Sequence, residues 1–256
     1  MHNAGYRALG LPFTYVPFKT DDLQGATRGM RALGIRGLGV SAPFKIRILE
    51  FLDNLHPLAR RIGAVNTVVN DDGVLTGHNT DVWGAVAALR EAMDPNGKRI
   101  LVIGAGGAAR AVVRGLVEEG AVVHVVNRTP QRAEELAEEV SAVGPAAVTW
   151  AGLADLSKLG EFDAVVNASS AGMPEYGPAS LVEERAIPPG LVVMDIVYKP
   201  VRTELLQVAE RAGGRVLHGG RMLLHQACRQ FELYTGHPAP IAAMDAALEQ
   251  AIRSES

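Results

Sequence analysis

One lysine of the sequence, Lys45, stands in a setting that suggests chemistry. In the stretch "GVSAPFKIRI" it follows an apolar run that is typical of a buried strand. We expect Ser41 to cap a short helix starting near Ala42, with Pro43 in its first turn. A helix N-terminus and partial burial both disfavour a cation, so such a lysine is suited to exchanging protons. A lysine whose stem merely covers apolar surface would give the same pattern, and this segment alone leaves both interpretations open.

A polar cluster that could partner the lysine lies in "GHNTDVWG", where an expected strand gives way to a helix. Asn79, Thr80 and Asp81 are all residue types that cap helices, but capping requires only one of them. The amide of Asn66 interrupts the apolar stretch "AVNTVV" and needs a hydrogen-bonding partner, either structural or on a ligand. One lysine, one aspartate and two amides fit a small ligand that carries several hydroxyl groups.

The stretch "RILVIGAGGAARAVVRGL" predicts a strand, a glycine turn and a helix. Gly104, Gly106 and Ala109 fit the G-x-G-x-x-G/A pattern of dinucleotide-binding proteins. The first glycine permits the tight turn, the second lets a pyrophosphate approach the backbone, and the small third residue lets the helix pack on the strand. The helix N-terminus then supplies free N–H groups for an anion.

The end of the next expected strand indicates which dinucleotide is bound. An NAD site usually has Asp or Glu there for the ribose 2′-hydroxyl, whereas this chain has Asn127, Arg128 and Thr129. Arg128 and Arg132 offer two guanidinium groups that suit a 2′-phosphate, so we expect NADP. The alternative is a solvated helix start in which Arg132 pairs with Glu135.

Around these residues, short β-branched runs alternate with helical patterns, which predicts an α/β fold with parallel sheets. The expected strands are 14–18, 38–41, 64–70, 74–78, 99–103, 122–126, 146–150, 163–167, 191–197 and 215–217. Pro95, Asn96 and Gly97 are expected to end a helix that starts near Asp81 and to mark a domain boundary. After about Leu217 the pattern is helical, and these helices could return to the first domain.

Composition excludes several classes of protein. The chain has 256 residues, of which 48% are hydrophobic and 21% charged, as in globular proteins of one large or two modest domains. A net charge of -3 gives no basic stripe for nucleic acid, and no apolar run is long enough to span a bilayer. Cys228 is the only cysteine, so we expect no intrachain disulfide and no cysteine-based zinc site, and no other residue is assigned to a metal. Together with the lack of a signal-peptide pattern, this leads us to expect a cytoplasmic location.

Seven motifs together resemble the shikimate dehydrogenase family. They are "SAPFK", "AVNTVV", "GHNTD", "GAGGAAR", "NRT", "NASSAGM" and "DIVYKP", and they occur in the family's order. The resemblance covers nearly the whole chain and implies NADP-dependent reduction of 3-dehydroshikimate to shikimate, a step of aromatic amino acid biosynthesis. It also implies an N-terminal α/β substrate domain, a Rossmann-type dinucleotide-binding domain and a cleft between them. We assign residues 1–82 and 221–256 to the substrate domain and residues 83–220 to the NADP-binding domain.

The resemblance also implies roles for individual residues. Lys45 and Asp81 match the family's catalytic pair, with Lys45 stabilising or protonating the developing alkoxide and Asp81 orienting it. The expected substrate contacts are Ser41, Asn66, Tyr198 and Gln226. The expected cofactor contacts are Gly104, Ala105, Gly106, Gly107, Ala108, Asn127, Arg128, Thr129, Arg132, Ser169, Ile196 and Met222. We expect a small hydroxy acid as substrate, no nucleic-acid or membrane partner, and a monomer or homodimer.

The sequence departs from the family pattern in three places. The family has a strand and a serine-bearing loop for the substrate carboxylate before "MHN", and these lie outside the sequence, so we expect normal NADP binding and weak shikimate binding. Arg221 and Gly39 stand where glycine and asparagine are usual. These features look closer to the shikimate dehydrogenase-like subgroup and leave quinate or an amino-shikimate open as substrate. The rival hypothesis is a protein that senses NADP(H) with little turnover.

Overall fold

The computed structural model of the chain describes residues 1–41, 43–142, 147–176 and 181–255. The chain divides into two compact units, residues 1–83 with 226–256 and residues 84–225. Two helices, α4 (Asp81–Arg90) and α8 (Gly219–Thr235), contribute residues to both units. Each unit is built around its own sheet, which confirms the α/β class.

The sheet of residues 84–225 is entirely parallel in the described part of the chain. Its strands are β5 (Arg99–Ile103), β6 (Val122–Asn127), β7 (Thr149–Gly152), β8 (Ala164–Asn167), β9 (Val192–Asp195) and β10 (Arg215–Leu217). They lie in the order β10-β9-β8-β5-β6-β7. This is the doubly wound Rossmann order, in which ligands bind at the carboxyl ends of the strands where the strand order reverses, beside β5.

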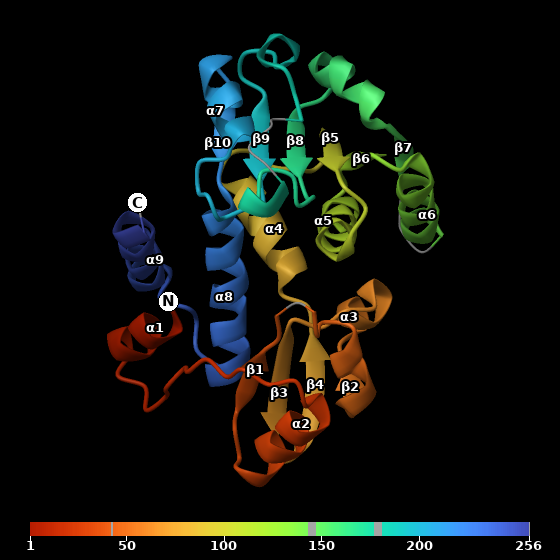
Figure 1. Cartoon of the computed structure of the whole chain (residues 1–256). Coiled ribbons are helices and arrows are strands. Elements are labelled where there is room, and N and C mark those ends of the chain that lie inside the picture. The colour runs from red at the N-terminus through yellow and green to blue at the C-terminus, as the bar shows by residue number, and fades with distance from the viewer. Residues whose placement is uncertain (42, 143–146, 177–180, 256) are drawn as a thin grey trace. The chain divides into compact units, whose positions relative to one another are not determined.

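Both faces of this sheet are covered (Figure 1). One face packs against α4, α5 (Gly107–Glu118) and α6 (Pro130–Ser141), and the other against η2 (Leu153–Glu161), η4 (Glu184–Ala186) and α7 (Glu204–Arg211).

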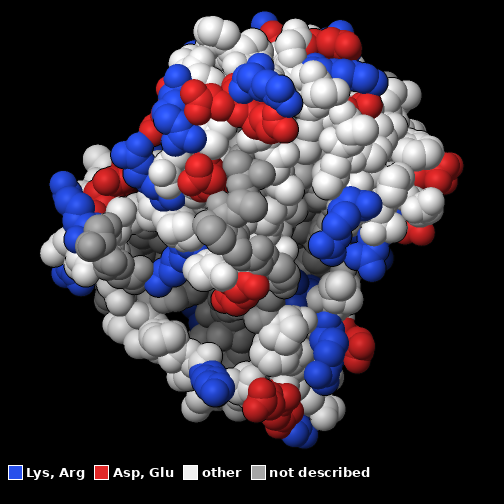
Figure 2. Space-filling model, turned by 45° about the horizontal axis from the view of Figure 1, so that its top comes forward, with Lys and Arg blue, Asp and Glu red and all other residues white. Residues whose placement is uncertain are grey.

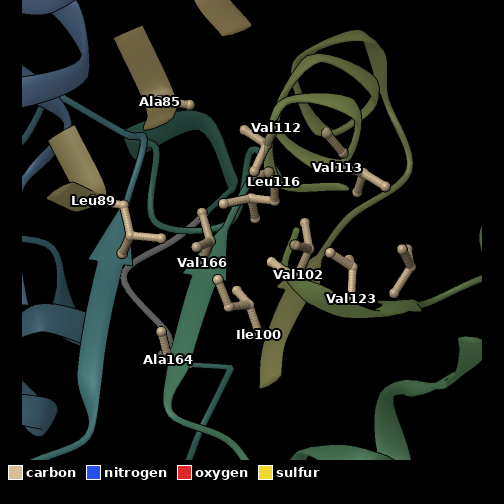
Figure 3. Packing of buried hydrophobic residues seen from close by; sticks show 14 of the residues in the cluster. Ala85, Leu89, Ile100, Val102, Val112, Val113, Leu116, Val123, Ala164 and Val166 are labelled. Atoms are coloured by element: carbon tan, nitrogen blue, oxygen red, sulfur yellow. The ribbon is translucent and has the colours of Figure 1, made fainter. Parts of the chain in front are cut away.

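Strand β5 shows why both faces must be apolar. Ile100 and Val102 enter one core, whereas Leu101 and Ile103 enter the other. Side chains of a strand alternate between faces, so a strand buried on both sides reads as a continuous apolar run. Figure 3 shows Ile100 and Val102 near Val112 of α5.

The sheet of the other unit has the order β1-β3-β4-β2. Its strands are β1 (Gly37–Gly39), β2 (Asn54–Leu55), β3 (Thr67–Asp71) and β4 (Val74–His78). The helices of this unit include α1 (His2–Ala8), α2 (Leu23–Ala32), η1 (Arg47–Phe51), α3 (Pro57–Ile62) and α9 (Ile241–Glu255). A further short helix, η3 (Pro174–Tyr176), belongs to the unit of residues 84–225. The core of the unit of residues 1–83 and 226–256 includes the fully buried residues Met30, Ile48 and Leu75.

The sheet β1-β3-β4-β2 is mixed, so the prediction of parallel sheets is wrong for this unit. Strand β3 pairs antiparallel with both β1 and β4, and only β2 with β4 is parallel. The reason is a two-residue hairpin between β3 and β4. Asp72 and Gly73 have φ of 51° and 91°, the positive values that a tight hairpin turn needs, and an Asp-Gly pair is suited to them.

Other expected elements differ from the structure. The segment 14–18 is not a strand, because no neighbouring strand pairs with it in the described part of the chain. Instead, the Tyr15 N–H donates to Asn3 Oδ1 at 2.7 Å, and Asn3 Nδ2 donates to the Tyr15 carbonyl at 2.8 Å. Strand β2 was not expected. The helix from Asp81 ends at Arg90, before Pro95. The expected strand 146–150 is found as Thr149–Gly152, and its first residue, Ala146, lies outside the described residues.

Charged groups of both signs are mixed on the face that Figure 2 shows, with Lys and Arg lying among Asp and Glu. Such mixing fits the many ion pairs of the chain, for example Arg211 with Glu184 at 2.9 Å. Across the described ranges, no helix is long and apolar enough to cross a membrane.

The hairpin turn yields a stability prediction. Gly73→Ala should lower the free energy of unfolding by about 1–2 kcal/mol, because an L-residue is strained at a φ of 91°. Gly29→Ala is the matched control. Gly29 lies within α2, and a Cβ there would meet nothing within 4 Å, so it should stabilise by about 0.4–1 kcal/mol. Urea unfolding of both variants measures the difference, and equal effects would contradict the turn assignment.

Candidate functional site

Lys45 lies in an irregular stretch. Residues 43–46 form turns, and η1 begins only at Arg47, with Ile46 as its N-cap and no side-chain cap. The predicted helix capped by Ser41 is therefore wrong: the Ser41 carbonyl accepts from the Phe44 N–H at 3.0 Å, and Ala42 lies outside the described residues. A proline soon after Ser41 favours turns here.

Lys45 is held by Asp81, as the sequence hypothesis requires. The distance from Nζ to Asp81 Oδ2 is 2.6 Å. The backbone of Lys45 is fixed too, because its carbonyl accepts from the Val65 N–H at 2.8 Å. The side chain of Lys45 is 36% exposed and that of Asp81 14%, so the pair lies at the surface edge of the buried network.

The amide of Asn66 connects this pair to the interior. Asn66 is 3% exposed and directly precedes β3. Its Nδ2 donates to Asp81 Oδ1 at 2.8 Å and to Thr80 Oγ1 at 3.0 Å. Its Oδ1 accepts from the Thr80 N–H at 2.7 Å and from Thr67 Oγ1 at 2.8 Å. Both oxygens of Asp81 are therefore engaged, which fixes the carboxylate that positions Lys45.

The other expected substrate residues differ in how they are placed. Gln226 joins the network through long hydrogen bonds, with its Oε1 3.5 Å from Asn66 Nδ2 and 3.4 Å from Thr80 Oγ1. Ser41 is exposed and follows Val40, whose N–H donates to the Asn66 carbonyl at 2.7 Å. Tyr198 is 46% exposed and belongs to the unit of residues 84–225.

Next to the network, His78 ends strand β4 as a neutral group. Burial lowers the pKa of His78 to about 4, and the charges of His56 and Arg229 act in the same direction. Its ring stacks on that of His56 with centroids 5.3 Å apart. At neutral pH, His78 therefore carries no charge beside the segment that supplies Asp81.

The glycine turn after β5 has the form that a dinucleotide needs. Gly104 has a φ of 115°, and a Cβ on it would lie 2.9 Å from the Ala168 carbonyl oxygen. Gly106 and Gly107 are exposed, and a Cβ on either would meet nothing within 4 Å. No side chain caps α5 at Gly106, so the first N–H groups of the helix are open to an anion. Ala109 is completely buried, as helix–strand packing requires.

Arg128 and Arg132 are available to a ligand. Both side chains are exposed. Within the described part of the chain, neither guanidinium has an ion pair or a side-chain hydrogen bond. The alternative pairing of Arg132 with Glu135 is therefore absent there. Arg110 and Arg114 on α5, by contrast, both pair with Glu139 of α6. Arg132 lies in the first turn of α6, and only Arg128 and Thr129 separate this helix from β6. Asn127 Nδ2 donates to the Thr129 carbonyl at 2.9 Å across this link.

A buried network that the sequence hypothesis missed shapes the ends of β8 and β9. Asp195 is completely buried and accepts from Asn167 Nδ2 at 2.9 Å and from Thr203 Oγ1 at 2.7 Å. Burial raises the pKa of Asp195. Ser169 Oγ donates to Asn167 Oδ1 at 2.7 Å, and the Ile196 N–H donates to the Asn167 carbonyl at 3.0 Å. The register that pairs Asn167 with Asp195 could be found only from the folded sheet.

The first turns of α8 hold the two remaining residues of interest. Met222 is 8% exposed and packs within the core of the parallel unit. Arg221 forms a double hydrogen bond with Glu91, with Nε 2.8 Å from Oε2 and Nη2 2.7 Å from Oε1. His225 Nε2 lies 2.7 Å from the same Glu91 Oε1. No group of three or more His, Cys, Asp or Glu suited to a metal ion is found among the residues described.

Three family models match the chain. The shikimate dehydrogenase substrate binding domain matches residues 1–68, and the shikimate/quinate 5-dehydrogenase model matches residues 87–201. The shikimate 5′-dehydrogenase C-terminal domain matches residues 219–249.

Two relatives, both named shikimate dehydrogenase (NADP(+)), match over the full chain. The protein of Methanothermobacter thermautotrophicus is 40% identical over 260 residues, covering 100% of this chain and 92% of the relative. The protein of Moorella thermoacetica is 44% identical over 269 residues, covering 100% and 89%.

Solved structures with similar folds include proteins crystallised with ligands. A shikimate dehydrogenase in complex with NADP+ has a TM-score of 0.92 at 36% identity, covering 98% of this chain and 89% of that one. Shikimate 5-dehydrogenase of Thermus thermophilus, with NADP(H) and shikimate, has a TM-score of 0.86 at 36% identity, covering 98% and 92%. Quinate dehydrogenase of Corynebacterium glutamicum, with NAD, has a TM-score of 0.88 at 33% identity, covering 97% and 92%.

The neutral state of His78 yields a pH prediction. The pKa is 6.5 in the unfolded chain and about 4 in the folded protein, so the unfolded state binds more protons in between. The free energy of unfolding should therefore fall as the pH drops from 6.5 to 4.

His78→Gln should make this fall shallower. One proton contributes at most ~1.4 kcal/mol per pH unit, and the part due to His78 is smaller because the ring is only partly buried. His2, whose pKa burial also lowers to about 4, should keep some dependence. Urea unfolding across the pH range measures both proteins. Identical slopes between pH 4 and 6.5 would contradict the lowered pKa of His78.

Proposed function

The chain belongs to the shikimate dehydrogenase family, and we propose that it uses NADP to interconvert 3-dehydroshikimate and shikimate or a close analogue. The observation that carries this proposal is the Lys45–Asp81 pair at 2.6 Å, which Asn66 anchors to the core. The relatives named as NADP-dependent dehydrogenases support turnover over the alternative of a sensor.

We assign the substrate to residues 1–82 and 221–256 and the cofactor to residues 83–220. The family model for the substrate binding domain supports the first assignment. The Rossmann strand order and the open glycine turn support the second.

Lys45 is the group proposed to act on the substrate carbonyl oxygen. When bound, NADPH supplies the hydride that reduces the carbonyl carbon. The Lys45 ammonium stabilises the negative charge that develops on the oxygen or gives that oxygen a proton. Because the Lys45 side chain is 36% exposed, water can return the proton. Asp81 keeps Nζ in position throughout, since both of its oxygens are held.

We propose that Ser41, Asn66, Tyr198 and Gln226 contact the substrate. Both ends of the Asn66 amide are hydrogen-bonded within the protein, so it can bind a hydroxyl group only in exchange for one of these bonds. Gln226 is well suited, because its hydrogen bonds of 3.4 and 3.5 Å are long enough to be exchanged for one to a ligand. Gly39 and Arg221 support a position near the shikimate dehydrogenase-like subgroup, which keeps quinate and amino-shikimate as candidate substrates.

The cofactor contacts are proposed from the geometry of the parallel unit. The pyrophosphate is assigned to the glycine turn and the 2′-phosphate to Arg128 and Arg132. The full set is Gly104, Ala105, Gly106, Gly107, Ala108, Asn127, Arg128, Thr129, Arg132, Ser169, Ile196 and Met222. Of these, Met222 has little exposed surface, so only its edge can reach a ligand.

We also propose that the protein acts in the cytoplasm in aromatic amino acid biosynthesis, as a monomer or homodimer. Its substrate is a small hydroxy acid, and no nucleic acid or membrane takes part. The mixed charges on the face that Figure 2 shows and the net charge of -3 support the expectation that no nucleic acid takes part.

The reaction itself is tested by following NADP reduction with shikimate, quinate and amino-shikimate in turn. We expect turnover with shikimate or with one of the two analogues. NADP binding without turnover of any of the three would favour the sensor instead.

Lys45→Ala should lower kcat by ~10²–10⁴-fold, the usual contribution of a positioned acid–base group. The dissociation constant for NADP should hardly change, because Lys45 acts on the substrate. Lys19→Ala is the control, since Lys19 is an exposed lysine of the same unit. A kcat within a few-fold of the unmutated protein would remove Lys45 from the mechanism.

Removing Arg128 and Arg132 together, as alanines, should weaken NADP binding at least about tenfold and leave NAD almost unaffected. Charge-assisted hydrogen bonds contribute ~1.5–3 kcal/mol each, and only NADP carries the 2′-phosphate. The double variant of Arg185 and Arg215, two exposed arginines of the same unit, is the control. Calorimetric titration with each cofactor measures the effect, and equal losses for both would mean that the arginines shape the loop.

A further inference from the structure

A buried glutamine of α8, Gln230, has no role assigned by the motifs or by the family resemblance. It lies one helical turn after Gln226 on α8, so both face the same side. Gln230 is 5% exposed. Its Nε2 donates to Thr67 Oγ1 at 2.9 Å and to the Asn66 carbonyl at 3.3 Å.

The two hydrogen bonds of Gln230 determine which group donates and which accepts between Thr67 and Asn66. Because the Asn66 carbonyl can only accept, the nitrogen of the Gln230 amide must face it. Thr67 Oγ1 then accepts from Gln230 and is left with its own hydrogen, which points to Asn66 Oδ1 at 2.8 Å.

The orientation of the Asn66 amide is therefore determined from two sides. The Thr80 N–H can only donate, and it too points to Asn66 Oδ1, at 2.7 Å. The nitrogen of Asn66 must then face Asp81 Oδ1, at 2.8 Å, while Oδ2 of the same carboxylate accepts from Lys45. A flipped amide would place its oxygen against the carboxylate and release Asp81.

We propose that Gln230, acting through Thr67 and Asn66, is a positioning residue that fixes the Lys45–Asp81 pair for catalysis. The inference rests on the proposed function of that pair. Four side chains relay the constraint from helix α8 to the lysine, and the three inner ones, Gln230, Thr67 and Asn66, are almost completely buried. Water cannot easily replace a lost partner there, so removing one donor should loosen the whole chain.

Four variants test this relay. Gln230→Ala and Gln230→Glu remove the donor, and Thr67→Val removes the hydroxyl while keeping the shape of the side chain. Thr67→Ser keeps the hydroxyl and should rescue. Gln250→Ala is the control, since Gln250 is an exposed glutamine on α9. Binding of NADP to each variant shows that it is folded.

We expect kcat to fall about tenfold in Gln230→Ala, Gln230→Glu and Thr67→Val, as for the loss of one hydrogen bond. It should stay within about threefold in Thr67→Ser and Gln250→Ala. In a Lys45→Ala background, Gln230→Ala should cause no further fall in kcat, because residues that act as a unit are not additive. Thermal stability should fall equally in both backgrounds.

Two results would overturn the inference. One is an unchanged kcat in both Gln230→Ala and Thr67→Val. The other is a loss in Gln230→Ala that multiplies in full with that of Lys45→Ala, as expected of a merely structural residue.

A measurement without turnover separates this inference from the proposed function. The rate at which an acylating reagent modifies Lys45 can be followed by mass spectrometry at constant pH. It should rise several-fold in Gln230→Ala and Thr67→Val, because the ammonium is less firmly held, and stay unchanged in Gln250→Ala. If the unmutated protein oxidises none of the three substrates but the rate rises, the proposed function fails and the relay stands. An unchanged rate overturns the relay.

Discussion

The orientation of one buried amide, that of Asn66, is the constraint on which the candidate catalytic geometry depends. Burial of an amide is costly unless both of its ends are hydrogen-bonded. Its oxygen is held by the Thr80 N–H and its nitrogen by Asp81, so the start of β3 is locked to the start of α4. Lys45 is then placed by Asp81, and not by a helix N-terminus as its sequence neighbours suggested. The position of Lys45 thus follows from the need of buried polar groups for hydrogen-bonding partners, and not from the helix start that its neighbouring residues predicted.

The proposed cofactor edge follows a different rule, because some of its charged and N–H groups have no side-chain partner in the described part of the chain. The N–H groups that open α5 have no side-chain cap, and Gly106 and Gly107 are exposed. Arg128 and Arg132 are likewise open, although the same unit pairs Arg110 and Arg114 with Glu139. Uncapped N–H groups and free guanidinium groups at the carboxyl ends of parallel strands are what an anionic cofactor requires.

Several strands and the glycine turn could be predicted from the sequence, because each depends on neighbouring residues of the chain. Strands β4, β5 and β10 have the expected bounds, because each is a short run of β-branched and apolar residues between turns. The glycine turn was also evident from spacing alone. The segment 14–18 is also rich in β-branched and aromatic residues but is no strand, since it contains Pro17 and a strand also needs a neighbour, which composition does not show. The Asp72–Gly73 hairpin was overlooked, and with it the antiparallel pairing of β3.

Gln230 shows why the second layer of the site could not be predicted. It is 164 residues away from Asn66 in the sequence, and a glutamine within a helix carries no local signal of a partner. Lys45 and Asp81 could be linked because Lys45 follows an apolar run, because Asp81 is one capping residue more than a helix needs, and because the family resemblance pairs the two. The two layers also differ in what they need. Lys45 must remain partly exposed to exchange protons with water, whereas the residues that hold it must be buried so that water cannot compete for their hydrogen bonds. A residue that serves only to orient another is therefore hidden from a search for exposed or unusual polar residues, and it is identified by following donors and acceptors through the folded structure.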